Sequence, residues 1–516
     1  MKLPVGTLKG EALNNFLYTS MQENVQAYYQ KFAEYDPEFL FTNWKKLIRC
    51  IDEFINIPFE NKHEEFIALY YCFKAEKEYK NDHIEKILVE EITANFDSQV
   101  SDRFIEFSLM CSRLNKRLTA SKYFDRSGGQ MNLSNTKNRI DYFQSRRKYF
   151  ITTLFMIPKL AKGKKKSHFN DLLDDFFTPV DGCLVNVTTC FYKILINNSI
   201  SYYEMRFDQK QQIGIGNFQF DHLEDFYLNP QRLSMLDQLE FRREEIGKLN
   251  QLSKVRNKIF SFSEIANGMN LMQEIFEKYQ ISDMPIYTSL NNLFLKIGAF
   301  IIDDYDITIG AAEFDRLTTQ FRDLKLYNQS VEYFENLNSI SPFQKMGDNY
   351  YSTIVLLDRY AHNLVLNALL RNRRFQVNSG FVFEDKVSSI LEDNGFKDLK
   401  ITRIGRKEFD VVAIKSKQFN IEASKDDKIY NFQCKNNYYD ISEVSSSAKI
   451  LAGLNRRLCS YYEKALLKEE KREQLLIDKT GLDEIEHFIV SRFPVISSNS
   501  NIINFNRFEY VVRDLL

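Results

Sequence analysis

The chain has 516 residues, of which 44% are hydrophobic and 27% are charged. This is an ordinary globular composition, so it excludes intrinsic disorder for most of the chain and predicts about two to four domains. The 69 Lys and Arg residues nearly balance the 70 Asp and Glu residues, which leaves a net charge of -1. No global basic field therefore marks a nucleic-acid-binding protein, and any such binding must come from local patches.

Cysteine usage and hydropathy indicate a reducing, aqueous compartment. The seven cysteines are widely spread and no pair has C-x-x-C spacing, which argues against a disulfide framework and against a structural zinc site. The first residues, MKLPVGTLKGEALNN, lack the apolar core of a signal peptide. The most apolar helical stretch, residues 353–370, is interrupted by Asp358, Arg359 and His362, which excludes a membrane span. We therefore expect a cytoplasmic protein that makes no membrane contact.

Most of the chain up to residue 375 is predicted to be helical. Apolar residues recur at the i, i+3, i+4, i+7 spacing of an amphipathic helix in several segments. The clearest stripes contain Trp44, Leu47, Ile48, Ile51, Phe54 and Ile55 in one helix, and Ile354, Leu357, Ala361, Leu364 and Leu369 in another. This pattern predicts a large, mainly α N-terminal region.

Two features divide this helical region. A break near residues 158–181 contains Pro158, the basic run KGKKK and a Pro/Gly pair, so we predict one helical domain at 1–160 and a second at 180–370. Around residues 201–220, Ile213 and Ile215 alternate with glycines, which predicts a short extended hairpin.

The last 140 or so residues have a different pattern. Residues 411–414, 429–434 and 487–493 are short apolar or alternating runs bounded by turn residues, and helical segments lie between them. Residues 376–516 are therefore predicted to form an α/β domain with a mixed central sheet, appended to the helical region.

Two carboxylates in this domain stand at its predicted buried surfaces. Glu384 borders the apolar face of a helix that we expect to end at Gly395. Asp410 lies at the start of an apolar strand, in the run EFDVV. A buried carboxylate is costly unless it is paired or bound to a metal.

The next strand presents an amide and an ammonium group together. In the run IYNFQCK, alternation puts Gln433 and Lys435 on one face and Cys434 on the other. Mg²⁺ binds hard oxygen ligands and usually takes one or two carboxylates. Asp410 and Glu384 can supply these carboxylates, and Gln433 and the Cys434 carbonyl can supply neutral oxygens. Lys435 can then orient a water or stabilise charge during phosphodiester hydrolysis.

A helix Glu, a strand Asp and a Gln-x-Lys pair on the following strand together resemble the PD-(D/E)XK, or restriction-endonuclease-like, nuclease superfamily. The resemblance covers residues 376–516 and implies a mixed sheet flanked by helices, with a catalytic site formed by Glu384, Asp410, Gln433 and Lys435 and loaded with Mg²⁺ or Mn²⁺. Gln433 stands where most members have Asp or Glu, a variant that resembles the Mrr-like branch. This difference removes one negative charge from the site and leaves open a degenerate, inactive site.

Basic residues flank these motifs. Arg403, Arg406 and Lys407 precede Asp410, and Arg456 and Arg457 follow the Gln-x-Lys pair on a predicted helix. All five are candidate nucleic-acid-binding residues, and ordinary surface charge is the alternative.

The sequence thus favours a metal-dependent nuclease, with DNA favoured over RNA because most members of the superfamily cut DNA. The helical region would sense, dock or oligomerise, an arrangement that resembles bacterial restriction or phage-defence effectors. Two alternatives remain open: an inactive nuclease-like domain that binds nucleic acid or protein, and a helical scaffold whose function lies wholly within residues 1–375. No G-x-x-x-x-G-K-[ST] motif occurs, so the chain is not a P-loop ATPase.

Overall fold

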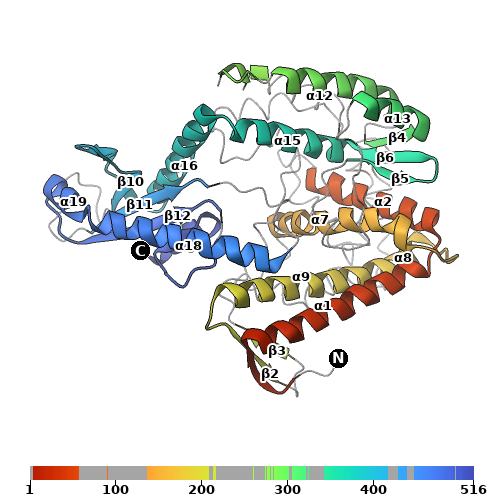
Figure 1. Cartoon of the computed structure of the whole chain (residues 1–516), viewed down its shortest axis with the longest axis horizontal. Coiled ribbons are helices and arrows are strands. Elements are labelled where there is room, and N and C mark those ends of the chain that lie inside the picture. Colours follow the sequence, from red (N-terminus) through yellow and green to blue (C-terminus); the bar gives the residue numbers. More distant parts are fainter. Residues whose placement is uncertain are drawn as a thin grey trace.

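The computed structural model describes residues 4–56, 136–208, 213–216, 284–301, 305–320, 342–415, 428–437, 447–493 and 495–515, with single residues and short pieces between 90 and 324. It is mostly helical, and a mixed sheet lies in the C-terminal region, as the sequence predicts. In Figure 1 this sheet and its helices lie at one end of the molecule and the N-terminal helices at the other.

The first part of the helical region is built on two pairs of packed helices. Helix α1 (Gly10–Ala33) lies beside α9 (Thr178–Ser199), and α2 (Pro37–Asn56) packs on α7 (Thr136–Leu160) (Figure 1). Two short helical segments, α8 (Phe169–Leu172) and η2 (Leu173–Phe177), lead into α9. The stripe predicted in α2 is confirmed for Trp44, Leu47, Ile48 and Ile51, which are buried. The side chains of Phe54 and Ile55, also predicted in this stripe, lie outside the described residues.

A small antiparallel sheet caps the α1–α9 pair. Strand β2 (Glu204–Asp208) pairs with β3 (Ile213–Gly216), which confirms the predicted hairpin, and β2 also pairs with β1 (Gly6–Lys9). Because α1 and α9 pack together, residues from both sides of the predicted break at 158–181 share one hydrophobic cluster. The domain limits 1–160 and 180–370 stay predictions.

The second part of the helical region packs around α15 (Ile354–Leu370). The Thr353 hydroxyl caps this helix by accepting a hydrogen bond from the Leu356 N–H at 3.2 Å. The remaining elements are α12 (Met284–Ile297), η5 (Gly298–Phe300), β4 (Asp306–Gly310), α13 (Ala311–Gln320), β5 (Gln344–Met346) and β6 (Asn349–Thr353), with sheet order β4-β6-β5. Among the described residues, no helix has both the length and the hydropathy needed to cross a bilayer.

The C-terminal sheet has the strand order β13-β12-β11-β10-β7. The β7–β10 and β10–β11 pairs are antiparallel, whereas β11–β12 and β12–β13 are parallel, so the sheet is mixed. Its strands are β7 (Phe396–Asp398), β10 (Val411–Lys415), β11 (Ile429–Lys435), β12 (Ile485–Ser491) and β13 (Ile502–Asn504), and a separate hairpin, β8 (Arg403–Ile404) with β9 (Lys407–Glu408), precedes β10.

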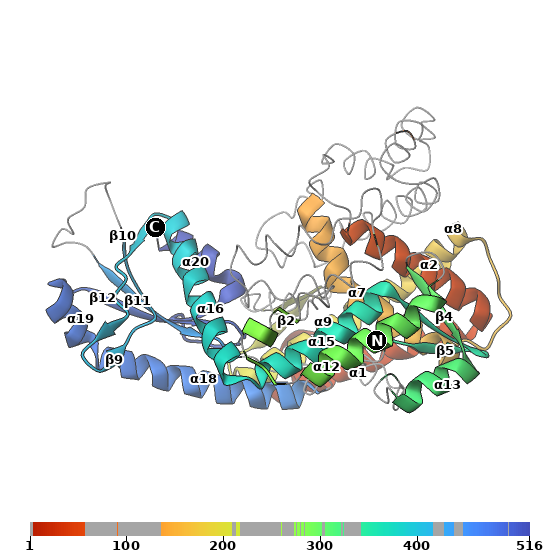
Figure 2. The ribbon, with the colours of Figure 1, turned by 90° about the horizontal axis from the view of Figure 1, so that it is seen from above.

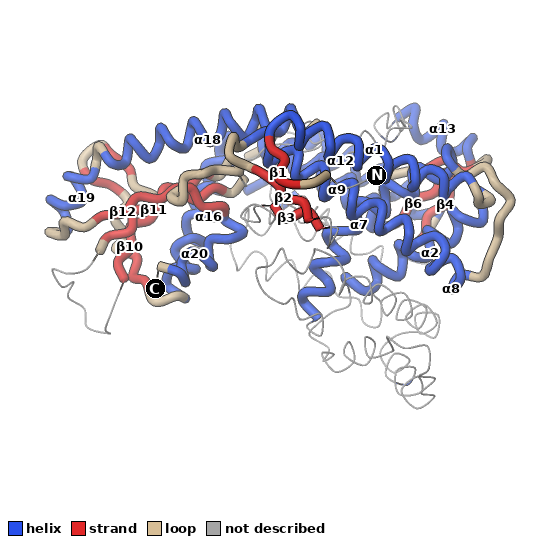
Figure 3. Tube along the Cα trace, turned by 90° about the horizontal axis from the view of Figure 1, so that it is seen from below, coloured by secondary structure: helices blue, strands red, loops and turns tan. Residues whose placement is uncertain are grey.

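Helices cover both faces of this sheet (Figures 2 and 3). Alternation along β10 and β11 sends Val411 and Phe432 to one face and Val412 and Ile429 to the other. The first face packs on α16 (Arg373–Asp393) and, through the turn η7 (Phe505–Arg507), on α20 (Phe508–Asp514). The second face packs on α18 (Ala448–Glu470) and α19 (Glu473–Thr480).

Helix α18 also connects the sheet to the helical region. Its first turns lie beyond the sheet and pack on α9, where Ala448, Leu451 and Ala452 share a hydrophobic cluster with Ile194. Figure 2 shows α18 running along the sheet toward the N-terminal helices. Helix α16 ends before Gly395, whose φ of +81° is the left-handed conformation that favours glycine, as the sequence predicts.

Candidate active site

Asp410 lies at the end of the sheet where β10 begins. The pairing of Val411 with Phe432 places Asp410 across from Gln433 on the neighbouring strand. The Asp410 Oδ2 atom accepts a hydrogen bond from the backbone N–H of Cys434 at 2.7 Å. The backbone of β11 thus anchors the carboxylate that the sequence singled out.

The surroundings of Asp410 partly oppose its ionisation. Burial raises the pKa of this carboxyl, whereas the Cys434 N–H and the Lys435 ammonium lower it. The negative charge of Glu469 raises the pKa again. Asp410 therefore lies in a poorly hydrated position where one cation only partly compensates for the acidic groups.

Glu384 reaches the same place from α16. Burial raises the pKa of Glu384 to about 7, and the nearby charge of Asp410 is the next largest cause. Two carboxyl groups that repel each other favour a shared cation or a shared proton. The helix acid and the strand acid, 26 positions apart in the sequence, are thus close enough for the charge of one to affect the other.

Lys435 completes this group of charges. Burial lowers the pKa of its ammonium group, whereas the charges of Asp410 and Glu469 raise it. The Nζ atom lies 5.7 Å from the ring centroid of Tyr461 on α18. Lys435 therefore lies on the α18 side of the sheet, close enough to Asp410 for the two charges to affect each other.

Gln433 presents an unsatisfied oxygen. Its Nε2 atom lies 3.4 Å from Oε1 of Glu469, to which it donates. Its Oε1 atom is buried and has no hydrogen-bond partner among the described residues. A buried amide oxygen without a donor is costly, so this atom calls for a ligand that the protein itself does not supply.

Sequence reasoning missed Glu469. This α18 residue is only 2% exposed, and its carboxylate accepts from Asn431 Nδ2 at 3.3 Å and pairs with Arg472 Nη1 at 2.9 Å. Since a carboxylate oxygen only accepts, Glu469 turns the NH₂ group of Gln433 toward itself and the Gln433 oxygen away. Helical spacing gives the signal that could have found it, because Glu469 follows Tyr462 and Leu466 at i+7 and i+3 on the buried side of α18.

The donor set fits a hard divalent cation. Within the part of the chain that the structure describes, no three or more His, Cys, Asp and Glu side chains are grouped as metal ligands. The available donors are instead two carboxyl groups, Asp410 and Glu384, with the unsatisfied amide oxygen of Gln433 beside them. All are oxygens, which suits Mg²⁺ or Mn²⁺. Burial raises the pKa of the Cys434 thiol well above its usual range, so only its backbone carbonyl remains a candidate ligand.

The five predicted nucleic-acid-binding residues divide into two groups. Arg403, Arg406 and Lys407 are exposed on the β8–β9 hairpin, just ahead of Asp410. Arg457 is exposed on α18, whereas Arg456 donates from Nη1 to the Asn198 carbonyl at 2.8 Å. Arg456 therefore contributes to the contact between α18 and α9.

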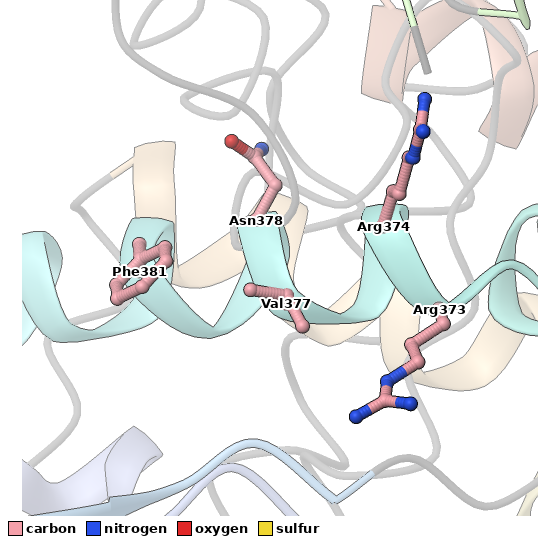
Figure 4. Close-up of a pocket in the computed structure, with 5 residues that line it drawn as sticks. All are labelled: Arg373, Arg374, Val377, Asn378 and Phe381. Atoms are coloured by element: carbon pink, nitrogen blue, oxygen red, sulfur yellow. The ribbon is translucent and has the colours of Figure 1, made fainter. Parts of the chain in front are cut away.

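A pocket of about 590 Å³ lies along the first turns of α16, ahead of Glu384 on the same helix (Figure 4). Exposed Val377 and Phe381 give it an apolar wall. Arg373 and Arg374 extend to opposite sides of the helix, and Arg374 donates to the Gln280 side chain. Part of the positive charge at this end of α16 is therefore engaged within the protein.

No family model matches this chain, and no curated protein or solved structure matches it either. The grouping of Glu384, Asp410, Gln433 and Lys435 at one end of the sheet is therefore the observation on which a function can be based.

Proposed function

We propose that residues 376–516 form a metal-dependent nuclease of the restriction-endonuclease-like fold, with DNA as its substrate. The observation that carries this proposal is the approach of Glu384, Asp410 and Lys435, from three separate segments, at one end of a mixed sheet. Helices on both faces of that sheet also agree with the layout that the resemblance implies.

Asp410, Glu384, Gln433 Oε1 and the Cys434 carbonyl would hold Mg²⁺ or Mn²⁺. Such an ion supplies Lewis-acid stabilisation of the phosphodiester and acidifies a water. The protein contributes the rest: the Cys434 N–H holds Asp410 in place, and Glu469 turns Gln433. The Lys435 ammonium, held between acidic groups, stabilises the negative charge that develops at the scissile phosphate.

Cleavage of DNA tests this proposal. Wild-type protein is expected to cut plasmid or single-stranded DNA with Mg²⁺ or Mn²⁺ and to stop in EDTA. Asp410→Ala and Lys435→Ala are each expected to lower the rate by about 10²–10³-fold, since each removes a group that acts on developing charge. Asp393→Asn and Lys397→Ala are matched controls, because Asp393 is exposed on α16, as part of the helix that carries Glu384, and Lys397 is exposed on β7 of the same sheet. Undiminished cleavage in Asp410→Ala would falsify the assignment.

A second candidate is a nuclease-like domain that binds nucleic acid or protein without cutting. Gln433 in place of an acid favours it, together with the lack of a three-acid group among the described residues. Binding of DNA by wild type with no cleavage under any divalent cation would select this function.

For residues 1–375 we propose sensing, docking or oligomerisation in the cytoplasm, as part of a bacterial phage-defence or restriction effector. Full-length protein should then self-associate or bind a partner, which analytical ultracentrifugation measures separately from DNA cleavage. A monomeric wild-type protein with no bound partner would contradict the oligomerisation role.

A further inference from the structure

One side of α18 carries a row of exposed basic residues. Arg457, Lys464 and Lys468 follow one another at i, i+7 and i+11, and Tyr461 lies between them at i+4. This spacing puts all four side chains on one side of the helix. All four are exposed, and Tyr461 retains 51% of its accessible surface. At 1.5 Å per residue the row is about 16 Å long.

The row leads to the candidate active site. Lys435 Nζ lies 5.7 Å from the ring centroid of Tyr461. Lys468 follows Tyr461 at i+7, so it lies on the same side of α18 as this ring. The basic row therefore passes beside Lys435 on the α18 side of the sheet.

These cations have no acidic partner in the described part of the chain. No ion pair joins Arg457, Lys464 or Lys468 to a described carboxylate. Other basic residues of the same domain are paired, such as Arg513 with Glu509 and Lys428 with Glu486. Uncompensated cations side by side on a helix attract a polyanion.

We propose that the basic row, defined as Arg457, Tyr461, Lys464 and Lys468, binds an unpaired nucleic-acid strand and leads it to Lys435 and Asp410. The cations contact phosphates of a strand that runs along the row. The exposed ring of Tyr461 offers a stacking surface that only an unpaired base can use. The direction of the strand toward the site rests on the proposed nuclease function, whereas the binding itself does not.

Arg456 lies outside the row. It projects about 100° away from Arg457 around the helix, and its guanidinium contacts the Asn198 carbonyl of α9. Of the two neighbouring arginines that the sequence singled out, only Arg457 belongs to the proposed binding surface.

The test is a binding titration that is separate from cleavage. Fluorescence anisotropy of labelled oligo(dT) and of a labelled hairpin duplex is measured with full-length protein in EDTA, and again in Ca²⁺, over a range of salt concentrations. Arg457→Glu combined with Lys464→Glu should weaken oligo(dT) binding by about tenfold or more and reduce the salt slope by about 1.4, since each lost phosphate contact on a single strand removes about 0.7. Tyr461→Ala should weaken oligo(dT) binding by about tenfold and duplex binding less.

Lys449→Glu combined with Lys479→Glu is the matched control, because it makes the same charge change at exposed positions of α18 and α19 outside the row. Binding unchanged in the row variants, or weakened equally in the control, overturns the proposal, as does a wild-type protein that binds no oligonucleotide. Equal loss of duplex and oligo(dT) binding in Tyr461→Ala overturns the assignment to an unpaired strand. If oligonucleotide binding depends on the row but the protein cleaves no DNA, the nuclease proposal fails and the binding proposal stands. If the protein cleaves DNA but the row variants bind oligonucleotide as the wild type does, the binding proposal fails and the nuclease proposal stands.

Discussion

Two acids, Asp52 in the helical region and Asp410 in the C-terminal domain, differ in how completely their charges are paired. In the helical region the fully buried Asp52 receives the Arg147 guanidinium, with Nη2 at 3.1 Å from Oδ2, and the Tyr305 hydroxyl at 2.8 Å. In the C-terminal domain Asp410 receives one backbone N–H, and its near neighbour Glu384 is another acid.

The difference separates structural acids from candidate functional ones. The charge of Asp52 is neutralised inside the fold, so it holds α2, α7 and Tyr305, the residue before β4, together and needs nothing from solution. The negative charge around Asp410 is only partly neutralised by Lys435, and burial together with the charge of Asp410 raises the pKa of Glu384 to about 7, which favours a bound cation. Burial alone therefore does not distinguish a functional carboxylate from a structural one. The distinction lies in whether the protein supplies enough cations and hydrogen-bond donors to neutralise the carboxylate.

The largest expected effect contrasts these two acids directly. Asp52→Ala should lower the free energy of unfolding by about 3–5 kcal/mol, because it leaves the Arg147 charge buried without its partner. Asp410→Asn should change it by less than about 1 kcal/mol, since an amide oxygen can still accept from Cys434. Urea denaturation of both variants measures the difference. Equal losses would mean that Asp410 is also a structural acid.

The next effect concerns Glu384 and pH. Because its pKa is raised from 4.5 unfolded to about 7 folded, the folded state binds more protons between those values, and stability falls as the pH rises through that window. Glu384→Gln cannot ionise and should stabilise the metal-free protein by about 1–3 kcal/mol near pH 8 and hardly at all near pH 4.

Thermal denaturation in EDTA at both pH values checks the Glu384 prediction. Asp393→Asn is the control, because Asp393 is exposed on the same helix and its charge is not among those that raise the pKa of Glu384. A gain in stability that is the same at both pH values would mean that ionisation of Glu384 is not its cause.

A smaller effect is expected from Glu469, which acts as a positioning residue through Gln433. Glu469→Gln should weaken Mn²⁺ binding by about 10–100-fold, because an amide at this position no longer dictates which way the Gln433 oxygen points. Isothermal titration with Mn²⁺ measures the affinity. Glu473→Gln is the matched control, since Glu473 faces His487 at 3.5 Å and does not contact Gln433. Equal affinity in both variants would remove Glu469 from the site.

The smallest effect is stabilisation by the metal itself. Mg²⁺ or Mn²⁺ at tenfold above its dissociation constant should add about 1.4 kcal/mol to the free energy of unfolding, through binding to the folded state alone. The shift in Tm should disappear in Asp410→Asn and persist in Asp52→Asn, where the affected acid lies in the helical region. A shift that persists in Asp410→Asn would place the metal elsewhere.

Local patterns accounted for much of the fold. Short apolar or alternating runs bounded by turn residues predicted β10, β11 and β12, and helical spacing predicted α2 and α15, because each of these segments buries apolar side chains in a local pattern. The strand order of the sheet was not predictable, since β11 pairs with β12 across 49 intervening residues and nothing local encodes that partner. The packing of α18 on α9 was equally hidden, because both helices have apolar faces that would fit many neighbours.

The sequence by itself determined which chemical groups Glu384, Asp410, Gln433 and Lys435 carry and, through alternation, that Gln433 and Lys435 share a face. Only the tertiary structure decided that the charge of Asp410 raises the pKa of Glu384, that Glu469 accepts a hydrogen bond from the Gln433 amide, and that Arg456 contacts α9 whereas no ion pair joins Arg457 to a described carboxylate. The physical reason is range: side-chain direction follows from the local backbone repeat, whereas charge–charge coupling and desolvation depend on groups that meet only when distant segments pack.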